Sequence, residues 1–364
     1  MDPISKKTTA KIERLAEAVM KTVKKGGNPF VEIPVRSLAN VKWSEKHRLV
    51  ELGDQKQQRY FFNVSMAKKF MQTFLVSDAC KELIESGKTT SIRDLYYVTK
   101  HTIGDTKQNT FDEQDESDPI IEDLEVAIDA LREELHLFAS RKGSMVGPIT
   151  IRDTGDTIDL RRMGSGGWAV PSIVEENVIQ FEKHEAKYVL LIEKDAVWTR
   201  FNEDKFWKRE KCIILQGGGQ PPRGVRRLVQ RLHKELGLPV FVLVDNDPWG
   251  FYIYSVVKQG SINLAYESMR MAVPDARFLG LSSFDKEKYK LPDNVAITMD
   301  DGDVSRAKQM LAYPWFGRKE WQKELREMMA SGKKYELEAL SRRGISFITE
   351  EYLPRKMRDR DWLA

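Results

Sequence analysis

Residues 188–192 read Tyr-Val-Leu-Leu-Ile and residues 240–244 read Val-Phe-Val-Leu-Val, and an acidic residue follows each run. Continuous apolar runs of this length are typical of strands that a parallel sheet buries on both faces. A third such run covers residues 212–215. Helical patterns separate and follow the runs, over residues 196–208, 223–236 and 248–258. The alternation predicts a β-α-β-α-β-α arrangement, so we expect an α/β fold in this half of the chain.

Three carboxylates stand directly after two of these strands. Glu193 follows the first run, and Asp245 and Asp247 follow the run at 240–244. The carboxyl ends of parallel strands form the usual ligand crevice of an α/β sheet, and residues two apart point the same way. Because gathered carboxylates repel one another without a cation, and hard oxygen ligands suit Mg²⁺, the pattern indicates a magnesium site. The alternative is a turn that caps the next helix, but Glu193 at a second strand end favours the metal site.

The chain has 364 residues, enough for two or three domains. Its apolar runs stop far short of the roughly 20 residues of a membrane span, and its charge-rich N-terminus lacks the apolar core of a signal peptide. We therefore expect a cytoplasmic protein without a membrane partner. Cys80 and Cys212 are too few for a disulfide framework or a cysteine-rich zinc site. A net charge of +4 is compatible with nucleic-acid binding without demanding it.

The N-terminal part of the chain reads as a small appendage over residues 1–65. Apolar positions at helical spacing predict a helix over residues 9–25. Short β-like runs follow, over residues 31–35, 47–52 and 59–64. We expect this appendage to contact another protein or another part of an assembly. The alternative is a packing extension of the next domain.

The helical period returns from Ser65 and ends at Gly87. Ser91 can then cap a short helix over residues 92–98, and two helices joined by a turn with glycine are typical of a helix-turn-helix module. The acidic segment 112–129 would repel phosphate. We therefore expect a solvated loop and helix start there, with Pro119 near the first helical position.

Glycine-rich breaks surround a β-type segment at residues 149–160 and place a domain boundary near residues 145–170. After the α/β region the tail is mostly helical. The expected helices cover residues 304–311, 318–329, 335–343 and 347–353, and the last one stops near Pro354.

Two adjacent tyrosines, Tyr96 and Tyr97, lie on the short helix that Ser91 caps. Arg93 stands four residues before Tyr97 and therefore on the same helix face. A tyrosine hydroxyl with a pKa near 10 needs a neighbouring base or cation to act as a nucleophile. Attack of Tyr97 on phosphorus would give a phosphotyrosine link. Taken alone, two aromatic residues on a helix more often pack in the core.

Four motifs occur in order: Ser-Ile-Arg-Asp-Leu-Tyr-Tyr at 91–97, the strand before Glu193, the glycines at 217–219 and Asp-Asn-Asp at 245–247. Together they resemble the A-subunit family of DNA topoisomerase VI, which includes the meiotic double-strand-break transesterase, over nearly the whole chain from about residue 65. The resemblance implies a winged-helix (CAP-like) domain with the catalytic tyrosine over residues 66–145. It also implies an α/β Toprim domain over residues 146–364, with a linker and a helical C-terminal region.

The resemblance also implies residue roles. In that family the second tyrosine of the motif is the nucleophile, which corresponds to Tyr97, and Tyr96 takes the aromatic packing position. Arg93 matches the basic residue of the motif and would bind the scissile phosphate. The carboxylates that hold Mg²⁺ correspond to Glu193, Asp245 and Asp247.

The glycine-rich segment departs from the family pattern. It reads Gln-Gly-Gly-Gly-Gln-Pro-Pro-Arg over residues 216–223, where relatives often carry a lysine among the glycines. A phosphate contact by this loop therefore stays open. Three arginines at the next helix start could still contact DNA, or they could be ordinary surface charge: Arg223, Arg226 and Arg227.

The sequence contains no Gly-x-x-x-x-Gly-Lys-Ser/Thr loop, so we do not expect this chain to bind ATP. The resemblance implies a separate GHKL-type ATPase B subunit, an A2B2 heterotetramer, and residues 1–65 as the docking surface. A double-strand cut needs two tyrosines, so the mechanism requires a homodimer of this chain. In the family, each tyrosine works against the metal site of the partner protomer.

The resulting hypothesis is the DNA-cleaving subunit of a type IIB DNA topoisomerase. Mg²⁺-dependent transesterification by Tyr97 would give a transient double-strand break with 5′-phosphotyrosyl links, for ATP-dependent strand passage and relaxation. Two alternatives remain. The chain could be a dedicated double-strand-break transesterase without strand passage, or a Toprim nuclease or DNA-binding module.

Overall fold

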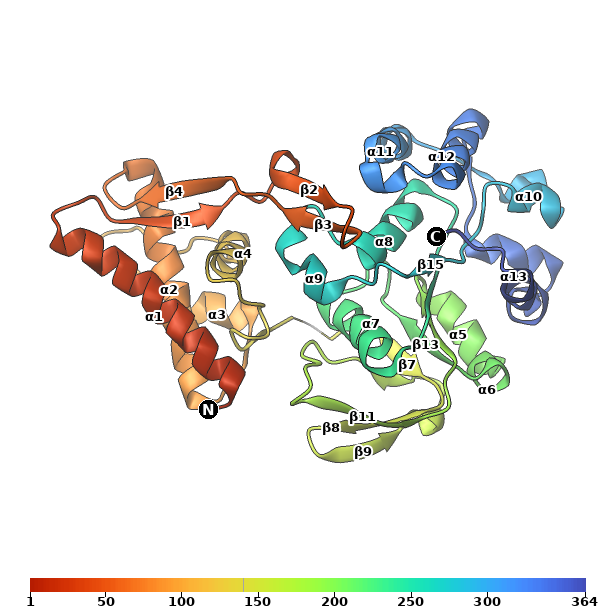
Figure 1. Ribbon diagram of the computed structural model, residues 1–364, viewed down its shortest axis with the longest axis horizontal. Coiled ribbons are helices and arrows are strands. Elements are labelled where there is room, and N and C mark those ends of the chain that lie inside the picture. The colour runs from red at the N-terminus through yellow and green to blue at the C-terminus, as the bar shows by residue number, and fades with distance from the viewer. Residues whose placement is uncertain (140) are drawn as a thin grey trace. The chain divides into compact units, whose positions relative to one another are not determined.

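The computed structural model describes residues 1–139 and 141–364, which form two compact units (Figure 1). Each unit is built from segments that are distant in the sequence. The first comprises Met1–Lys42, Leu52–Ser140 and Ile262–Glu267. The second comprises Trp43–Glu51, Arg141–Ser261 and Ser268–Ala364.

Helix α1 (Pro3–Lys24) opens the first unit and begins at Pro3, whereas the apolar spacing predicts a start at Thr9. The Asp2 side chain accepts hydrogen bonds from two N–H groups of the first turn. Pro3 occupies the first turn, where its missing N–H costs nothing. The predicted start was wrong because a capping residue, rather than the apolar periodicity, decides where this helix begins.

Residues 1–65 are divided between the two units. Ile12 of α1 shares a buried core with the helices that follow, and strands β1 (Phe30–Pro34) and β4 (Lys56–Tyr60) pair antiparallel in the first unit. Strands β2 (Val41–Ser44) and β3 (Leu49–Leu52) form a separate hairpin, most of whose residues belong to the second unit. The segment is therefore divided between the two units and does not form a compact unit of its own.

The expected pair of helices is present as α2 (Val64–Ser86) and α3 (Ile92–Thr99). Gly87 ends α2 in the left-handed conformation, with φ of +64°, which glycine adopts without strain. The Ser91 hydroxyl then accepts a hydrogen bond from the Asp94 N–H (3.0 Å) and caps α3, as predicted. The core of this unit joins α1, α2, α3 and α4 (Ser117–Ala127).

The acidic segment 112–129 does contain a loop and a helix start, but the expectation that it is solvated was wrong for two of its carboxylates. Asp123 is buried and pairs with Arg59 (2.7 Å) and Arg36 (3.0 Å). Glu125 is buried as well, 3.3 Å from the guanidinium of Arg132. Arg59 and Arg36, which neutralise Asp123, are distant from it in the sequence, so local charge counting could not reveal its burial.

The second unit is built around a six-stranded sheet in the order β10-β7-β13-β12-β14-β15. Strands β13, β12, β14 and β15 run parallel, which confirms the predicted α/β region, and β7 and β10 run antiparallel at one edge. The strands are β7 (Ser144–Val146), β10 (Trp168–Ala169), β12 (Tyr188–Ile192), β13 (Cys212–Gln216), β14 (Val240–Leu243) and β15 (Arg277–Phe278).

Helices cover both faces of this sheet (Figure 1). Val189 and Leu191 of β12 pack in one buried core with α7 and α8, while the alternating residues of β12 pack in a second core with α5 and α6. The predicted helix at 196–208 is two helices, because Lys205 adopts a left-handed conformation (φ +50°). The four helices are α5 (Asp195–Glu203), α6 (Phe206–Glu210), α7 (Arg223–Leu236) and α8 (Pro248–Gln259).

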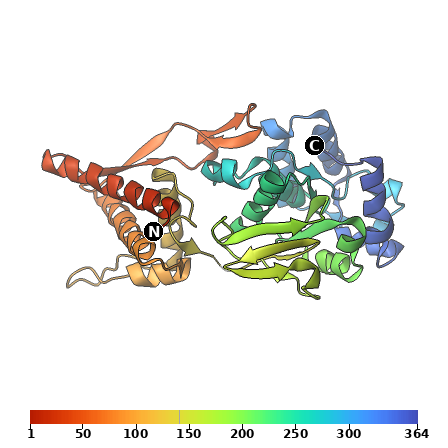
Figure 2. The same ribbon diagram turned by 60° about the horizontal axis from the view of Figure 1, so that its bottom comes forward.

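Residues that precede the first parallel strand form a separate three-stranded sheet. The predicted β-type segment at 149–160 is a hairpin of β8 (Ile149–Asp153) and β9 (Asp156–Asp159), and β11 (Ile179–His184) completes the order β11-β8-β9. These yellow-green strands can be followed in Figure 2. The sequence pattern did not predict the third strand.

The tail differs from the expected helices at two places. Residues 335–343 contain a 3₁₀ helix only over Leu337–Arg343. The predicted stop near Pro354 was wrong, because a π-helical turn over Ile348–Tyr352 continues directly into α13 (Leu353–Asp359), and Pro354 lies inside this continuous helical stretch. The remaining α-helices and strands are α9 (Ser268–Met271), α10 (Asp285–Lys288), β16 (Ile297–Thr298), α11 (Asp301–Ala312), α12 (Lys319–Ser331), β17 (Lys333–Lys334) and, in the first unit, β5 (Thr90–Ser91) and β6 (Leu137–Phe138).

Within residues 1–139 and 141–364, no helix combines the length of a membrane span with sufficient apolar character.

Candidate active site

The three predicted carboxylates follow two neighbouring strands of the parallel sheet. Glu193 comes directly after β12, and Asp245 and Asp247 come just after β14, which pairs with β12 in parallel. The Asp245 N–H donates a hydrogen bond to the Glu193 carboxylate (3.2 Å). The strands on the two sides of β12 are reached by successive crossovers, so the carboxylates lie at the point where the strand order reverses.

Asp245 is 3% exposed and its two carboxylate oxygens have different partners. Oδ1 accepts a hydrogen bond from the Leu337 N–H (2.8 Å), and Oδ2 pairs with Lys194 Nζ (2.8 Å). The Leu337 N–H is held beside Asp245 because Tyr335, two residues earlier, exchanges two backbone hydrogen bonds with Asn246. The C-terminal tail therefore helps to build the site.

Asp247 also caps the next helix, which was the alternative interpretation of the Asp-Asn-Asp sequence at 245–247. Its side chain accepts a hydrogen bond from the Gly250 N–H (2.5 Å) and caps α8. Gly250 is required there, since a Cβ atom at this position would lie 2.7 Å from the Asp245 carbonyl oxygen. Capping occupies one oxygen of Asp247 and does not exclude a metal at the other.

Burial shifts the acidity of the three carboxyl groups in the same direction. Burial, together with the charge of Asp245, raises the pKa of Glu193 to about 7. The pKa of Asp245 rises to about 6, because burial outweighs the opposing effects of Lys194 and the Leu337 N–H. Burial also raises the pKa of Asp247. Each carboxyl group therefore ionises less readily than it would in water.

The donor chemistry fits a hard divalent cation, because all three side chains offer carboxylate oxygens from a partly buried site that disfavours uncompensated charge. Within residues 1–139 and 141–364, however, no three His, Cys, Asp or Glu side chains are grouped tightly enough to hold an ion as they stand. The cation that contacts Asp245 in this structure is Lys194.

The glycine-rich loop supports Glu193 from the neighbouring strand. The Gly219 N–H donates a hydrogen bond to the Glu193 carbonyl oxygen (3.0 Å), and Gly218 and Gly219 have φ of +64° and +91°. Residues other than glycine are strained in that conformation. The loop thus has a structural role through one amide, and its phosphate contact remains a prediction.

The two adjacent tyrosines of α3 have opposite environments. Tyr96 is 6% exposed, its hydroxyl donates to the Asp112 carbonyl oxygen (2.9 Å), and Lys100 Nζ donates to the same hydroxyl (2.7 Å). Tyr97 is 60% exposed, and Arg93 of the same helix lies at the first turn. Tyr97 is therefore accessible to solvent, whereas Tyr96 lies in the core.

The three arginines predicted to contact DNA are not equivalent. Arg226 is 5% exposed, so its side chain is buried and is not ordinary surface charge. Arg227 forms a bidentate ion pair with Glu175 (2.6 and 2.8 Å) and donates to the Arg270 carbonyl oxygen. Arg223 begins α7. Two of the three are thus engaged within the protein, and DNA contact by these residues remains a prediction.

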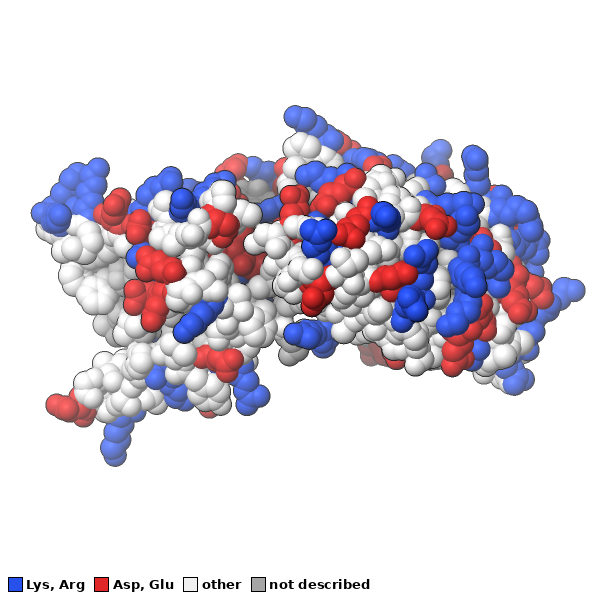
Figure 3. Space-filling model, turned by 90° about the horizontal axis from the view of Figure 1, so that it is seen from below, with Lys and Arg blue, Asp and Glu red and all other residues white. Residues whose placement is uncertain are grey.

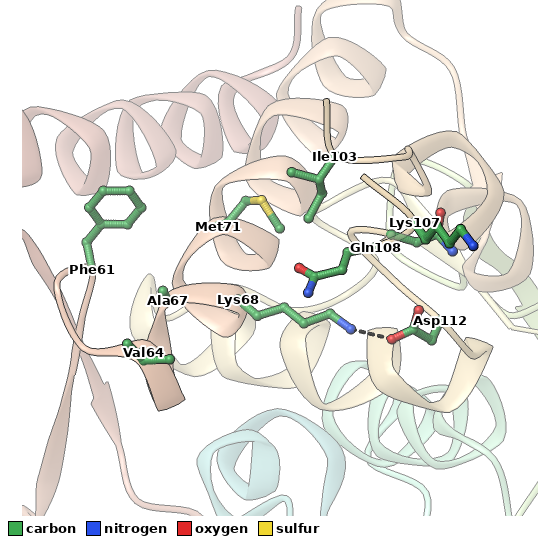
Figure 4. A pocket seen from close by; sticks show the side chains of 10 residues that line it. Phe61, Val64, Ala67, Lys68, Met71, Ile103, Lys107, Gln108 and Asp112 are labelled. Carbon is green, nitrogen blue, oxygen red and sulfur yellow. Dashed lines mark hydrogen bonds and ion pairs between the residues drawn. The ribbon is translucent and has the colours of Figure 1, made fainter. Parts of the chain in front are cut away.

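Neither the surface charge of the protein nor its cavity of about 780 Å³ points to the predicted site residues. Figure 3 shows Lys and Arg interspersed with Asp and Glu on the face in view, in keeping with the small net charge. A cavity of about 780 Å³ in the first unit is lined by Phe61, Val64, Met71 and Ile103 and by the Lys68–Asp112 ion pair (Figure 4). None of the predicted site residues lines it.

Comparison with known proteins agrees with these features. Residues 188–357 match the Toprim domain model of the topoisomerase 6 A-subunit/Spo11 proteins, residues 68–137 match the type IIB DNA topoisomerase model, and residues 142–185 match the all-beta domain of the DNA topoisomerase VI alpha subunit. A Pyrococcus horikoshii protein, named as the A subunit of type 2 DNA topoisomerase 6, is 45% identical over 363 residues, which cover 97% of this chain and 94% of the relative. The chain belongs to the A-subunit family of topoisomerase VI.

Two further members of this A-subunit family bear the same name. The Pyrococcus abyssi protein is 45% identical over 364 residues, covering 97% of this chain and 94% of its own length. The Hyperthermus butylicus protein is 41% identical over 374 residues, which cover 98% of this chain and 96% of the relative. The similarity therefore extends over both units of the chain.

Sequence reasoning missed three contributors to this topoisomerase VI-type site. Lys194 stands next to Glu193, and this adjacency was the available signal. The Leu337 main chain lies far along the sequence and carries no motif. The Gly219 amide belongs to a loop whose glycines suggested only phosphate binding.

Proposed function

We propose that this chain is the DNA-cleaving A subunit of a type IIB topoisomerase and that Tyr97 is its nucleophile. The observation that carries the residue assignment is the contrast between neighbouring tyrosines. Tyr97 is exposed on α3, whereas Tyr96 is buried with its hydroxyl hydrogen-bonded. An attacking hydroxyl must reach a phosphodiester of duplex DNA, and the exposed side chain satisfies this condition.

The reaction is a transesterification. The Tyr97 oxygen loses its proton and forms a bond to a DNA phosphorus, the bond from phosphorus to the 3′ oxygen breaks, and that oxygen takes up a proton. The products are a 5′-phosphotyrosyl end and a 3′ hydroxyl. One phosphodiester replaces another, so the reverse reaction reseals the strand without an energy source. Arg93, four residues before Tyr97 on α3, would offset the charge of the scissile phosphate.

Metal-dependent chemistry belongs to the carboxylates of the second unit. Glu193, Asp245 and Asp247 would hold Mg²⁺, which when bound stabilises negative charge on the phosphate. The Toprim match and the oxygen-only donor set support a divalent ion, and Mg²⁺ is our proposal within that class. The hydrogen bonds from Leu337 and Gly219 would keep Asp245 and the Glu193 main chain in position.

The proposal also divides the chain into domains. We assign residues 66–145 to a winged-helix domain, and helices α2 and α3, joined by the turn at Gly87, support this assignment. Residues 146–364 would form the Toprim domain with a linker and a helical C-terminal region.

The proposed partners are duplex DNA, a second copy of this chain and a GHKL-type ATPase B subunit, in an A2B2 heterotetramer. ATP would be bound by the B subunit. We propose residues 1–65 as the surface that docks this subunit. Support comes from large apolar side chains that the segment exposes, including Phe62 at 71%, and from the cavity that Phe61 lines (Figure 4).

The decisive experiment compares Tyr97→Phe with Tyr96→Phe. Supercoiled plasmid is incubated with the A subunit, its B partner, Mg²⁺ and ATP, and the reaction is quenched with denaturant. We expect protein linked to 5′ ends for the wild type and for Tyr96→Phe, and none for Tyr97→Phe. The Tyr96 change removes a hydroxyl from the core, so it should cost about 1 kcal/mol of stability.

Two outcomes would contradict the proposal. Cleavage by Tyr97→Phe at the wild-type rate would favour a Toprim nuclease. Covalent cleavage without relaxation, in the presence of the B subunit, would favour a break-forming transesterase that does not pass strands.

A further inference from the structure

Lys194 is the cation in contact with the proposed metal ligands. Its ammonium group lies 2.8 Å from Asp245 Oδ2 and also 3.0 Å from Glu338 and 3.4 Å from Glu336. The Lys194 side chain is 25% exposed and that of Asp245 only 4%. This one lysine therefore connects a buried carboxylate of the site to two carboxylates at the surface.

The position of Lys194 conflicts with a metal ion on the same oxygen. The other oxygen, Asp245 Oδ1, already accepts the Leu337 N–H, so Oδ2 is the oxygen that an incoming cation would use. A divalent ion and an ammonium group a few ångströms apart repel each other strongly where water is partly excluded. The lysine must leave Asp245 for the ion to bind there.

Alternative partners for the displaced lysine are already within reach. Glu336 and Glu338 flank Leu337, the residue whose N–H holds Asp245. Their side chains are 52% and 43% exposed, so they are not committed to the core. Lys194 can give up one contact and retain two, which lowers the cost of releasing it.

We propose that Lys194 is a displaceable counter-ion, which pairs with Asp245 in the metal-free enzyme and moves to Glu336 and Glu338 when a divalent ion binds. The inference rests on the proposed role of Asp245 as a metal ligand. It makes Lys194 a positioning residue that competes with the ion and keeps the carboxylates from repelling one another before the ion arrives.

The test measures Mn²⁺ binding to the full chain by calorimetry. We expect Lys194→Met to bind Mn²⁺ about fivefold more tightly than the wild type, because a competing ion pair of this size is removed. Lys194→Arg retains the charge and should bind no more tightly than the wild type. Lys334→Met is the matched control, since Lys334 pairs with Asp303 (2.6 Å) and exerts its charge on Asp247 without contacting the proposed ligands.

The unfolding temperature is a second measurement, and it distinguishes a counter-ion role of Lys194 from a purely structural role. Without metal, Lys194→Met should unfold at a lower temperature than the wild type, because Asp245 loses its counter-ion. Saturating Mn²⁺ should then raise its unfolding temperature by more than it raises that of the wild type. A lysine that only supports the fold would lower stability in both conditions and would weaken metal binding.

The outcomes separate this inference from the proposed function. Unchanged or weaker Mn²⁺ binding by Lys194→Met, or equal tightening by Lys334→Met, would overturn the counter-ion role while leaving the metal site intact. If the wild type shows no saturable binding that Asp245→Asn abolishes, the proposed metal site itself fails, and the counter-ion role fails with it.

Discussion

At the scale of single residues, side chains that are close in the sequence lie in different environments. Tyr96 and Tyr97 differ by one position, and a rotation of about 100° per helical residue sends one into the core and the other toward solvent. Asp245 and Asp247 differ as well, since one is held by a distant main-chain N–H and the other caps its own helix. Residue type indicates what chemistry is possible, and the direction of the side chain decides which residue performs it.

The raised pKa of Glu193 leads to a prediction on pH and stability. The pKa is about 7 in the folded protein and about 4.5 in an unfolded chain, so the group ionises less readily when folded. The stability that depends on the protonated form is complete below pH 4.5 and is lost as the pH rises through 7. We expect metal-free wild type to lose about 1–3 kcal/mol relative to Glu193→Gln between roughly pH 5 and pH 8.

Urea unfolding of both proteins at each pH, with chelator present, measures this difference. Adding Mg²⁺ at the higher pH should reverse it, because the ionised Glu193 then gains a cation. A stability difference that does not change with pH in chelator would show that Glu193 is not a buried, protonatable carboxyl group.

At the scale of elements, the site depends on loops and a tail that strengthen the ends of two strands. The loop after β13 donates the Gly219 N–H to the Glu193 main chain, and the tail donates the Leu337 N–H to Asp245. Neither segment supplies a side chain to the proposed metal site. Both determine where the carboxylates stand.

We predict that Gly219→Ala weakens cleavage. Nothing lies within 4 Å of an added Cβ atom, but the φ of +91° is strained for alanine, so the loop should shift and its hydrogen bond to Glu193 should lengthen. A cost of about 1–2 kcal/mol, divided between stability and activity, is expected. The measurements are the rate of covalent complex formation and the melting temperature.

Gly166→Ala is the matched control, since an added Cβ atom there also meets nothing within 4 Å and the backbone is not in the left-handed region. It should leave both quantities unchanged. Equal effects of the two substitutions would show that the left-handed conformation of Gly219 does not cause the loss of cleavage or stability.

At the scale of the whole molecule, the proposed nucleophile and the proposed metal ligands belong to different units. Tyr97 lies in the first unit, and Glu193, Asp245 and Asp247 lie in the second. With one tyrosine for each cleaved strand, the proposed double-strand cut would use Tyr97 of two protomers. The similarity to topoisomerase VI A subunits extends over both units.

A complementation experiment follows from the family expectation that each tyrosine uses the partner's metal site. Differently tagged Tyr97→Phe and Glu193→Gln chains are co-expressed, and the mixed dimer is purified through both tags. We expect it to nick plasmid on one strand, because the intact tyrosine of one protomer meets the intact carboxylates of the other. Each variant alone should neither nick nor cut.

An inactive mixed dimer would show that tyrosine and carboxylates act within one protomer, provided that a mixed dimer of wild type and Tyr97→Phe nicks under the same conditions. This second dimer controls for assembly, because it retains at least one complete site in either arrangement.

The apolar runs and their periodicity were sufficient to predict the parallel strands, the crossover helices and the carboxylates at the strand ends, because burial on both faces requires continuous apolar residues. The short helix with its Ser91 cap was equally predictable, since capping is local. What only the tertiary structure decided depends on contacts between distant segments. These include the buried pairing of Asp123 with Arg59, the internal use of Arg227, the Leu337 N–H on Asp245 and the choice of Lys194 as its counter-ion. Local patterns record which side chains can ionise or donate, but their partners are fixed by packing that brings together residues far apart in the sequence.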